Sequence, residues 1–179
     1  MNRIIFYMMI LLTLVQSVGS KAENYYMSPG GDDNNSGLSI DQAWATLQNA
    51  SSFGIGAGDT LFVMGGTYSN YQYFHRTDGS GGAPGNPLVI KAYGDDVAIF
   101  QWTGRGDRPL NYYFYFYDGN DHVTLDGFSY LNPGDSLFIK LEGHEDASFA
   151  IRFMGESGNW CENITIRGIE IDGDHEWDA

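Results

Sequence analysis

An acidic run near the carboxyl end of the sequence contains the residue types that bind a hard metal ion. In the stretch IDGDHEWD, Asp172, Asp174 and Glu176 stand at alternate positions, with His175 among them. Carboxylate oxygens are the ligands that Ca²⁺ prefers, and a loop after a strand can bring several of them together. Zinc is disfavoured because the run supplies a single histidine. The run therefore predicts a calcium site at Asp172, Asp174 and Glu176, with an ordinary acidic turn as the alternative.

Two arginines stand on segments that alternate between apolar and polar residues. Arg152 lies in FAIRFM and Arg167 in NITIRGIEI, and in both cases the apolar neighbours are expected to be buried. Because side chains alternate across a strand, both arginines should point outward. Elimination from a uronate-containing polysaccharide needs a base beside the acidic proton and a cation that neutralises the carboxylate. Arg152 and Arg167 are candidates to line such a sugar groove, with a solvated strand face as the alternative; no residue is singled out as the catalytic base.

The segment YYFYFY, residues 112–117, places aromatic residues on both faces of a predicted strand. One face should lie in the core. The other face can form a platform for sugar rings, which present apolar C–H groups to aromatic rings. We expect Tyr113 and Tyr115 to take part in sugar binding, with a purely structural aromatic ladder as the alternative.

Composition restricts the partners. The chain has 179 residues, with 9 Lys and Arg against 23 Asp and Glu, and a formal net charge of −14. Such a charge disfavours nucleic acids and anionic membrane surfaces as partners, and it is compatible with calcium. Cys161 is the one cysteine, so no internal disulfide can form. An exported, glycine-rich chain with one cysteine favours a bacterial source.

The first 22 residues have the features of an export signal. Arg3 gives a positive start, residues 4–15 are apolar, and residues 20–22 offer small side chains where a signal peptidase reads. We expect cleavage before Glu23, a domain at residues 23–179, no membrane span after cleavage, and a secreted or periplasmic location. The alternative is a retained anchor.

A repeat indicates how the candidate residues are positioned. HVTLDGFSYL begins at His122 and NITIRGIEIDG at Asn163, so the two stretches are offset by 41 residues. In a coil of parallel strands, each turn stacks on the one below, and like residues form ladders. The repeat therefore predicts an all-β parallel solenoid, with an antiparallel β-sandwich as the alternative. The residues expected to stack are Val123 with Ile164, Thr124 with Thr165, Leu125 with Ile166, Gly127 with Gly168, and Phe128 with Ile169.

Short strands rich in β-branched and aromatic residues follow a single amphipathic segment. That segment, residues 40–53, has an apolar face at helical spacing that includes Trp44 and Leu47. It predicts a helix that covers the first coil, because the open end of a solenoid needs a cap. The predicted strands are 60–68, 86–94, 97–100, 112–117, 122–130, 136–141, 149–154 and 163–171.

The amino-terminal motifs resemble a known group. YYMSPGGDDNNSG, AWATLQNA, GAGDTLFVMGGTY and GSGGAPGNPLVIKAYG, within residues 25–94, are similar in type and order to the start of secreted pectin lyase-like proteins. These are polysaccharide lyases of the pectate lyase, alginate lyase and chondroitinase B kind, together with glycoside hydrolases. The resemblance implies a right-handed parallel β-helix with an amino-terminal capping helix and a polysaccharide substrate, which uronate units would suit.

Members of this group are usually longer than the present chain, in which about four coils can be placed. Their catalytic groove lies along the middle coils, so we expect the chain to be a fragment that is polysaccharide lyase-like in its full form. A non-catalytic β-helix that binds carbohydrate or a cell surface and an inactive truncated product are the alternatives.

Overall fold

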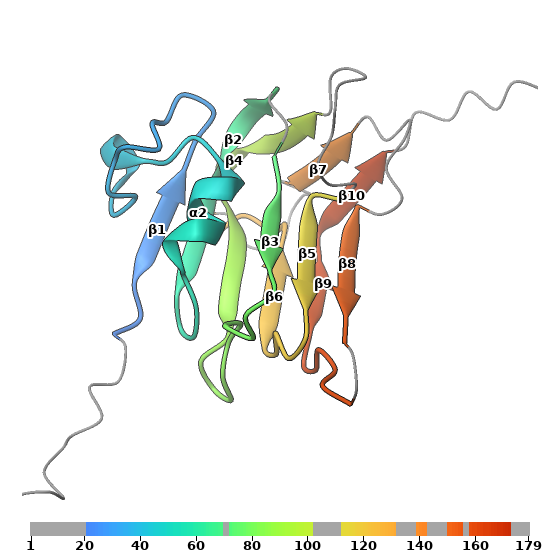
Figure 1. The fold of residues 1–179 in the computed structure, drawn as a ribbon. Coiled ribbons are helices and arrows are strands. Elements are labelled where there is room, and N and C mark those ends of the chain that lie inside the picture. Colours follow the sequence, from blue (N-terminus) through green and yellow to red (C-terminus); the bar gives the residue numbers. More distant parts are fainter. Residues whose placement is uncertain are drawn as a thin grey trace, which may run out of the picture.

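A computed structural model describes residues 21–69, 72–101, 112–131, 139–142, 150–155 and 158–172. The described residues are mostly β, with one short 3-10 helix, η1 (Ile40–Gln42), and one α-helix, α2 (Leu47–Phe53) (Figure 1). The strands are β1 (Asn24–Met27), β2 (Thr60–Tyr68), β3 (Phe74–Arg76), β4 (Leu88–Gln101), β5 (Phe114–Tyr117), β6 (Val123–Asp126), β7 (Ile139–Glu142), β8 (Ile151–Met154), β9 (Thr165–Arg167) and β10 (Ile169–Asp172). No described helix is long and apolar enough to cross a membrane. The predicted signal peptide falls almost wholly on residues outside the described ranges and stays a prediction.

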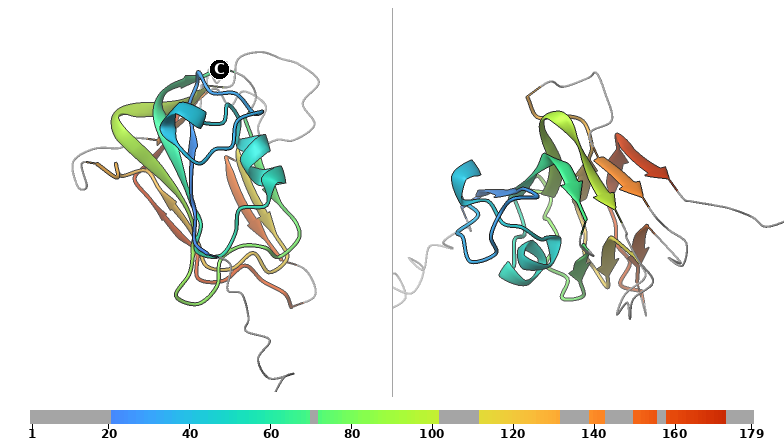
Figure 2. Two further views of the ribbon diagram at one scale, coloured as in Figure 1. Left: turned by 90° about the vertical axis from the view of Figure 1, so that its left-hand side faces the viewer. Right: turned by 90° about the horizontal axis from the view of Figure 1, so that it is seen from above.

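The strands form two parallel sheets. The larger one is seven-stranded, in the order β1-β2-β4-β6-β9, and β7 and β10 extend it from the second half of β4. The smaller one has the order β3-β5-β8. Every ladder between described strands is parallel. Figure 2 shows the two sheets on opposite sides of one core, and the chain passes from one to the other repeatedly. This parallel arrangement disfavours the antiparallel sandwich.

The 41-residue repeat predicts the register correctly. β6 and β9 pair with Leu125 beside Ile166 and Asp126 beside Arg167. At the bend that follows, Gly168 has a positive φ of 64°, and a Cβ added to Gly127 would clash with the Gly168 carbonyl oxygen. The glycines therefore repeat because the backbone of one layer touches the backbone of the next.

The described strands do not form a closed solenoid. The connecting segments 102–111, 132–138 and 143–149 lie outside the described residues. The structure confirms a mostly β fold with parallel sheets and a single α-helix, and the right-handed β-helix stays a hypothesis.

The core follows the predicted pattern only in its earlier layers. Val123 and Leu125 are buried as expected, but Ile166 is 47% exposed. The reason is position, because β9 is the last strand of its sheet among the described residues and no described strand covers it. The remaining predicted core residues are half-buried: Phe128, Ile164 and Ile169.

The predicted helix 40–53 is wrong in its first half, where only the 3-10 turn η1 forms. α2 begins at Leu47 because the hydroxyl of Thr46 accepts a hydrogen bond from the Asn49 backbone N–H at 3.1 Å. The Asp33 carboxylate accepts a hydrogen bond from the Thr46 backbone N–H at 3.0 Å and holds the extended approach to the helix. An N-cap fixed from a distant loop therefore overrides the apolar periodicity.

Trp44 covers the first strand, although it does so from an extended segment. It forms a parallel bridge with Met27, and its backbone N–H donates to the Tyr26 carbonyl at 2.9 Å. Its indole N–H donates to the Asn35 carbonyl at 2.9 Å, and its ring stacks on Tyr25 at a centroid distance of 5.1 Å. The edge of β1 is thereby covered, as a solenoid end requires.

Candidate functional site

Three side chains from three strands form one row on the outer face of the smaller sheet. His75 on β3 lies beside Tyr115 on β5, which lies beside Arg152 on β8. Their neighbours Phe114 and Phe116 are buried, so the alternation of the strand turns the row away from the core. All three row residues are half-buried. We call His75, Tyr115 and Arg152 the outer row.

The Tyr115 ring is held from several sides. Its centroid lies 5.0 Å from that of His75 in an edge-on arrangement and 4.6 Å from that of Tyr112 in a stacked one. Tyr117 stacks at 6.1 Å, and the guanidinium carbon of Arg152 lies 5.5 Å from the Tyr115 centroid. An aromatic ring fixed in this way is a preorganised surface for an apolar ring face.

His75 has one satisfied and one unsatisfied ring nitrogen. Its Nδ1 lies 3.1 Å from the hydroxyl of Tyr112. Burial raises the pKa of Tyr112 to about 12, so this hydroxyl keeps its proton and donates. Burial also lowers the pKa of His75, which keeps the imidazole neutral at pH 7. We therefore assign the imidazole proton to Nε2, which is buried and makes no hydrogen bond within the described part of the chain.

A polar groove of about 470 Å³ opens beside His75, between α2 and β3. Ser51 joins the two elements, because its hydroxyl donates to the His75 carbonyl at 2.6 Å and accepts from the His75 N–H at 3.1 Å. The lining residues are Gln48, Ser51, Ser52, Gly54, Tyr73, His75, Arg76, Thr77 and Asp78.

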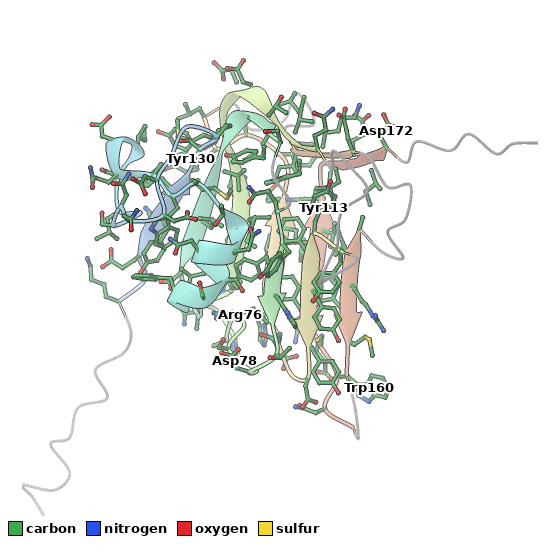
Figure 3. The ribbon with its side chains drawn as sticks, turned by 45° about the horizontal axis from the view of Figure 1, so that its top comes forward. Arg76, Asp78, Tyr113, Tyr130, Trp160 and Asp172 are labelled. Carbon is green, nitrogen blue, oxygen red and sulfur yellow. The ribbon has the colours of Figure 1, made fainter. Side chains whose placement is uncertain are left out.

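Arg76 belongs to the framework of this groove. It points inward from β3 and is buried, and its guanidinium donates to the carbonyl of Ser51 at 3.1 Å and to that of Ile55. These carbonyls lie at and beyond the carboxyl end of α2, where backbone acceptors have no partner in the helix. Asp78 lies 3.9 Å from Arg76 at the rim (Figure 3). Arg76 therefore fixes the helix end against β3.

Of the predicted sugar-binding residues, Tyr115 and Arg152 lie together in the outer row, and Tyr113 does not. Tyr113 is 1% exposed, and its single hydroxyl proton is shared between the carbonyl oxygens of Phe100 at 2.9 Å and Glu142 at 2.7 Å. It precedes β5, which begins at Phe114, so strand alternation does not turn it outward. The expectation that Tyr113 forms part of an exposed platform is wrong.

Arg167 lies on the larger sheet, so Arg152 and Arg167 do not line one groove. Its guanidinium donates to Asp126 at 2.8 Å, and Lys91 contacts the same carboxylate from the other side. Burial alone would raise the pKa of Asp126. The hydrogen bonds from Arg167, Lys91 and the Phe128 backbone N–H outweigh it and lower that pKa. This Lys91–Asp126–Arg167 group is a charged ladder across β4, β6 and β9.

The carboxylate of Asp172 already has a cationic partner. The ammonium of Lys140 lies 3.0 Å from Asp172, 2.8 Å from Glu142 and 3.5 Å from Glu170. Hydrogen bonds to Glu142 and Asp172 raise the pKa of Lys140, so the ammonium is charged and neutralises the Asp172 carboxylate. The described residues contain no group that could hold a metal ion. Two predicted ligands, Asp174 and Glu176, lie outside the described ranges, and the calcium site stays a prediction.

Sequence reasoning missed His75 and Tyr112 as parts of the site. β3 has only three residues, and its identity depends on pairing with β5. The signal available was the aromatic stretch YQYFHR, which repeats the character of YYFYFY. Aligning the Tyr-Phe pair at residues 73–74 with the pair at 113–114 would have placed His75 opposite Tyr115.

Comparisons with known proteins show similarity to two kinds of carbohydrate-processing enzyme. No family model matches the chain. A lacto-N-biosidase of Bifidobacterium longum subsp. longum is 37% identical over 79 residues, which is 42% of this chain and 5% of that protein. A rhamnogalacturonan lyase structure matches with a TM-score of 0.61 and 19% identity, over 85% of this chain and 36% of that one. The GH136 lacto-N-biosidase from Eubacterium ramulus matches with a TM-score of 0.56 and 15% identity, over 95% of this chain and 37% of that one.

The structural matches show a shared fold. The chain spans about a third of the length of each solved structure and a small part of the curated relative.

Proposed function

We propose that residues 23–179 form the first coils of a right-handed parallel β-helix in a secreted, carbohydrate-active protein, and that the outer row binds its glycan. The stacked parallel sheets and the two structural matches support the fold. The observation that carries the binding site is the outer row, in which the Tyr115 ring lies between a neutral imidazole and a guanidinium.

The row has the chemistry that recognises a sugar unit. A pyranose ring can stack its C–H face on Tyr115, where the neighbouring aromatic side chains keep the ring in place. Arg152 can bind a carboxylate through its planar guanidinium, which lies against the Tyr115 ring. A glycan with uronate units therefore suits the row best.

For the reaction, we favour a polysaccharide lyase-like elimination in the longer protein. Such a reaction needs a base and a cation beside one sugar. The row supplies a cation in Arg152, but Nδ1 of His75 accepts from Tyr112 and Nε2 carries the proton, so the base would have to come from further coils. A polymer groove also extends over several stacked coils. The Asp172 carboxylate would bind Ca²⁺ only if its ion pair with Lys140 were broken. We therefore expect binding by residues 23–179, and cleavage only in the longer protein.

A glycoside hydrolase is the second candidate, and the identity to lacto-N-biosidase favours it. Most glycoside hydrolases use two carboxyl groups roughly 5–10 Å apart. Asp78 is the one carboxylate among the residues that line the described groove, so a second carboxyl group would have to come from elsewhere. The products distinguish the two reactions, because elimination leaves an unsaturated sugar and hydrolysis does not.

The test is to purify residues 23–179 and measure their binding to pectate, alginate, chondroitin, rhamnogalacturonan and lacto-N-biose-terminated glycans, with and without calcium. Products would be followed by ultraviolet absorbance for unsaturated sugars and by a reducing-end assay. We expect binding to at least one glycan, loss of that binding in Tyr115→Ala, and no substantial cleavage. If the segment bound none of these glycans, or if Tyr115→Ala left binding unchanged, the outer row would not be the glycan-binding site. Clear turnover abolished by Arg152→Ala or Arg167→Ala would show that the catalytic site is complete in this segment.

A further inference from the structure

The larger sheet carries a second group of aromatic rings on its outer face. The centroid of Phe62 lies 5.4 Å from Tyr26, 5.4 Å from Tyr93 and 4.8 Å from Tyr130. Tyr93 and Tyr130 are nearly parallel, with centroids 5.9 Å apart and an interplanar angle of 12°. We call Phe62, Tyr93 and Tyr130 the tyrosine platform.

Within the platform, one ring is buried and another is exposed. Phe62 is buried although it points away from the core, because the tyrosines cover it. Tyr130 is 54% exposed. Because the exposed ring adjoins two further aromatic rings, it belongs to a contiguous aromatic surface rather than standing alone, and such surfaces mark binding sites.

Tyr130 is held in position although it is exposed. Its backbone N–H donates to the Ala92 carbonyl at 2.9 Å. The preceding Ser129 is fully buried, its hydroxyl donates to the Gly94 carbonyl, and it accepts from the Leu131 backbone N–H at 3.1 Å. The backbone on both sides of Tyr130 is thus tied to β4, which makes the ring a preorganised contact.

The charged ladder continues the surface from the platform. Phe62 is the cross-strand neighbour of Lys91, and the same row runs on through Asp126 to Arg167. The three charged groups sum to +1, in a chain whose formal net charge is −14. The side chain of Arg167 is 56% exposed beyond its bond to Asp126, so it offers further donors on the same sheet face as the aromatic rings.

We propose that the tyrosine platform is a second glycan-binding site, which stacks one pyranose unit on the Tyr130 and Tyr93 surface, while Arg167, further along the same sheet face, holds a polar substituent of a neighbouring unit. Parallel aromatic rings beside hydrogen-bond donors suit the two-sided chemistry of a sugar, which has apolar faces and a polar edge. Arg167 gives a uronate carboxylate an additional contact that a neutral hexose lacks. This inference rests on the proposed function, since it takes the same class of ligand.

The platform is separate from the outer row. The two lie on different sheets that face opposite sides of the core (Figure 2). Figure 3 shows Tyr130 on the β2 and β4 side, away from Arg76 and Asp78 at the groove. One sugar unit therefore cannot contact both, and two contacts along one polysaccharide raise its apparent affinity through effective concentration.

The test compares Tyr130→Ala with Leu131→Ala, a neighbour of similar exposure that lacks an aromatic ring. Isothermal titration of the full chain with an oligosaccharide of uronate units and one of neutral hexose units would give both affinities. We expect Tyr130→Ala to weaken binding by about 3–10-fold, and Tyr130→Phe and Leu131→Ala to change it by less than about twofold. Arg167→Ala should weaken the uronate ligand more than the neutral one.

Parallel titrations of Tyr115→Ala separate this inference from the proposed function. If Tyr115→Ala weakens binding and Tyr130→Ala does not, the tyrosine platform is overturned and the outer row stands. If only Tyr130→Ala weakens binding, the platform stands and the outer row fails. Intermolecular nuclear Overhauser effects, recorded on the unaltered chain with assigned tyrosine ring resonances, give a readout that does not depend on the folding of variants. Glycan C–H protons should receive magnetisation from the Tyr130 ring, and its absence would overturn the platform.

Discussion

The guanidinium carbon of Arg152 lies 5.5 Å from the centroid of the Tyr115 ring, directly across the ladder between β8 and β5. The arginine and the ring therefore form one continuous surface on the outer face. A planar guanidinium can rest on an aromatic ring and still present donors at its edge, whereas an ammonium makes a point contact.

Replacing Arg152 by lysine should therefore weaken binding although the charge is kept. We expect Arg152→Lys to lower the affinity for a uronate oligosaccharide by about 3–10-fold, and Arg152→Ala to lower it further. Isothermal titration would measure both, with Lys140→Arg as the control because Lys140 belongs to another face. Equal affinity of Arg152→Lys and the unaltered chain would show that charge alone matters at this position.

The Lys91–Asp126–Arg167 ladder predicts an acid-sensitive contribution to stability. The pKa of Asp126 in the folded chain is lowered from its ordinary value of 3.8. Its stabilising effect is therefore complete above about pH 4 and is lost as the pH falls through the lower, folded-state pKa. Asp126→Asn should cost about 1–3 kcal/mol at pH 7 and flatten the dependence below pH 4. Urea unfolding between pH 7 and pH 3 tests this, with the exposed Asp41→Asn as the control. If the free energy of unfolding of Asp126→Asn fell below pH 4 as steeply as that of the unaltered chain, Asp126 would not be the source of the acid sensitivity.

Trp44 should be one of the largest single contributors to stability. The side chain is fully buried, stacks on Tyr25 and donates a hydrogen bond, so Trp44→Ala should destabilise the chain by about 3–5 kcal/mol. Trp160 is 62% exposed, and Trp160→Ala should change the free energy of unfolding by less than about 0.5 kcal/mol. Denaturant titrations give both values, and a loss below about 1 kcal/mol for Trp44→Ala would mean that it does not close the core.

The last described layer should promote self-association of the isolated segment. Ile166 and Ile171 pair with the buried residues Leu125 and Leu141, yet Ile171 is 55% exposed. Apolar side chains beside unpaired strand edges are a template for another chain. Ile171→Lys should shift sedimentation velocity profiles towards monomer. Leu38→Lys, at 54% exposure near η1, should leave them unchanged. A monomeric unaltered segment at about 100 μM would contradict this prediction.

The repeat made part of the fold predictable. Stacked layers of a parallel sheet place equivalent residues above one another, so the offset between Thr124 and Thr165 was enough to give the register of β6 and β9. The same alternation placed Tyr115 and Arg152 outward. The same offset places Asp126 beside Arg167, but it does not find Lys91, because Lys91 stands 35 residues before its partner Asp126 and not 41.

What the sequence did not reveal depended on distant contacts. The start of α2 is set by Asp33 and Thr46, and local periodicity contains no information about that loop. Tyr113 precedes its strand, so alternation does not apply to it. His75 lies on a strand too short to recognise alone. Its place in the outer row depends on contacts with Tyr112 and Tyr115, which follow about 40 residues later in the chain.

The most direct test of the account is to detect contact between a bound glycan and the outer row. Residues 23–179, labelled on tyrosine rings, would be mixed with a uronate oligosaccharide, and intermolecular nuclear Overhauser effects would be recorded. The account predicts cross-peaks between sugar C–H protons and the Tyr115 ring. These cross-peaks should be lost in Tyr115→Ala, and circular dichroism would verify that this variant keeps the fold. A bound glycan that gives cross-peaks only to rings outside the smaller sheet would contradict the assignment of the outer row.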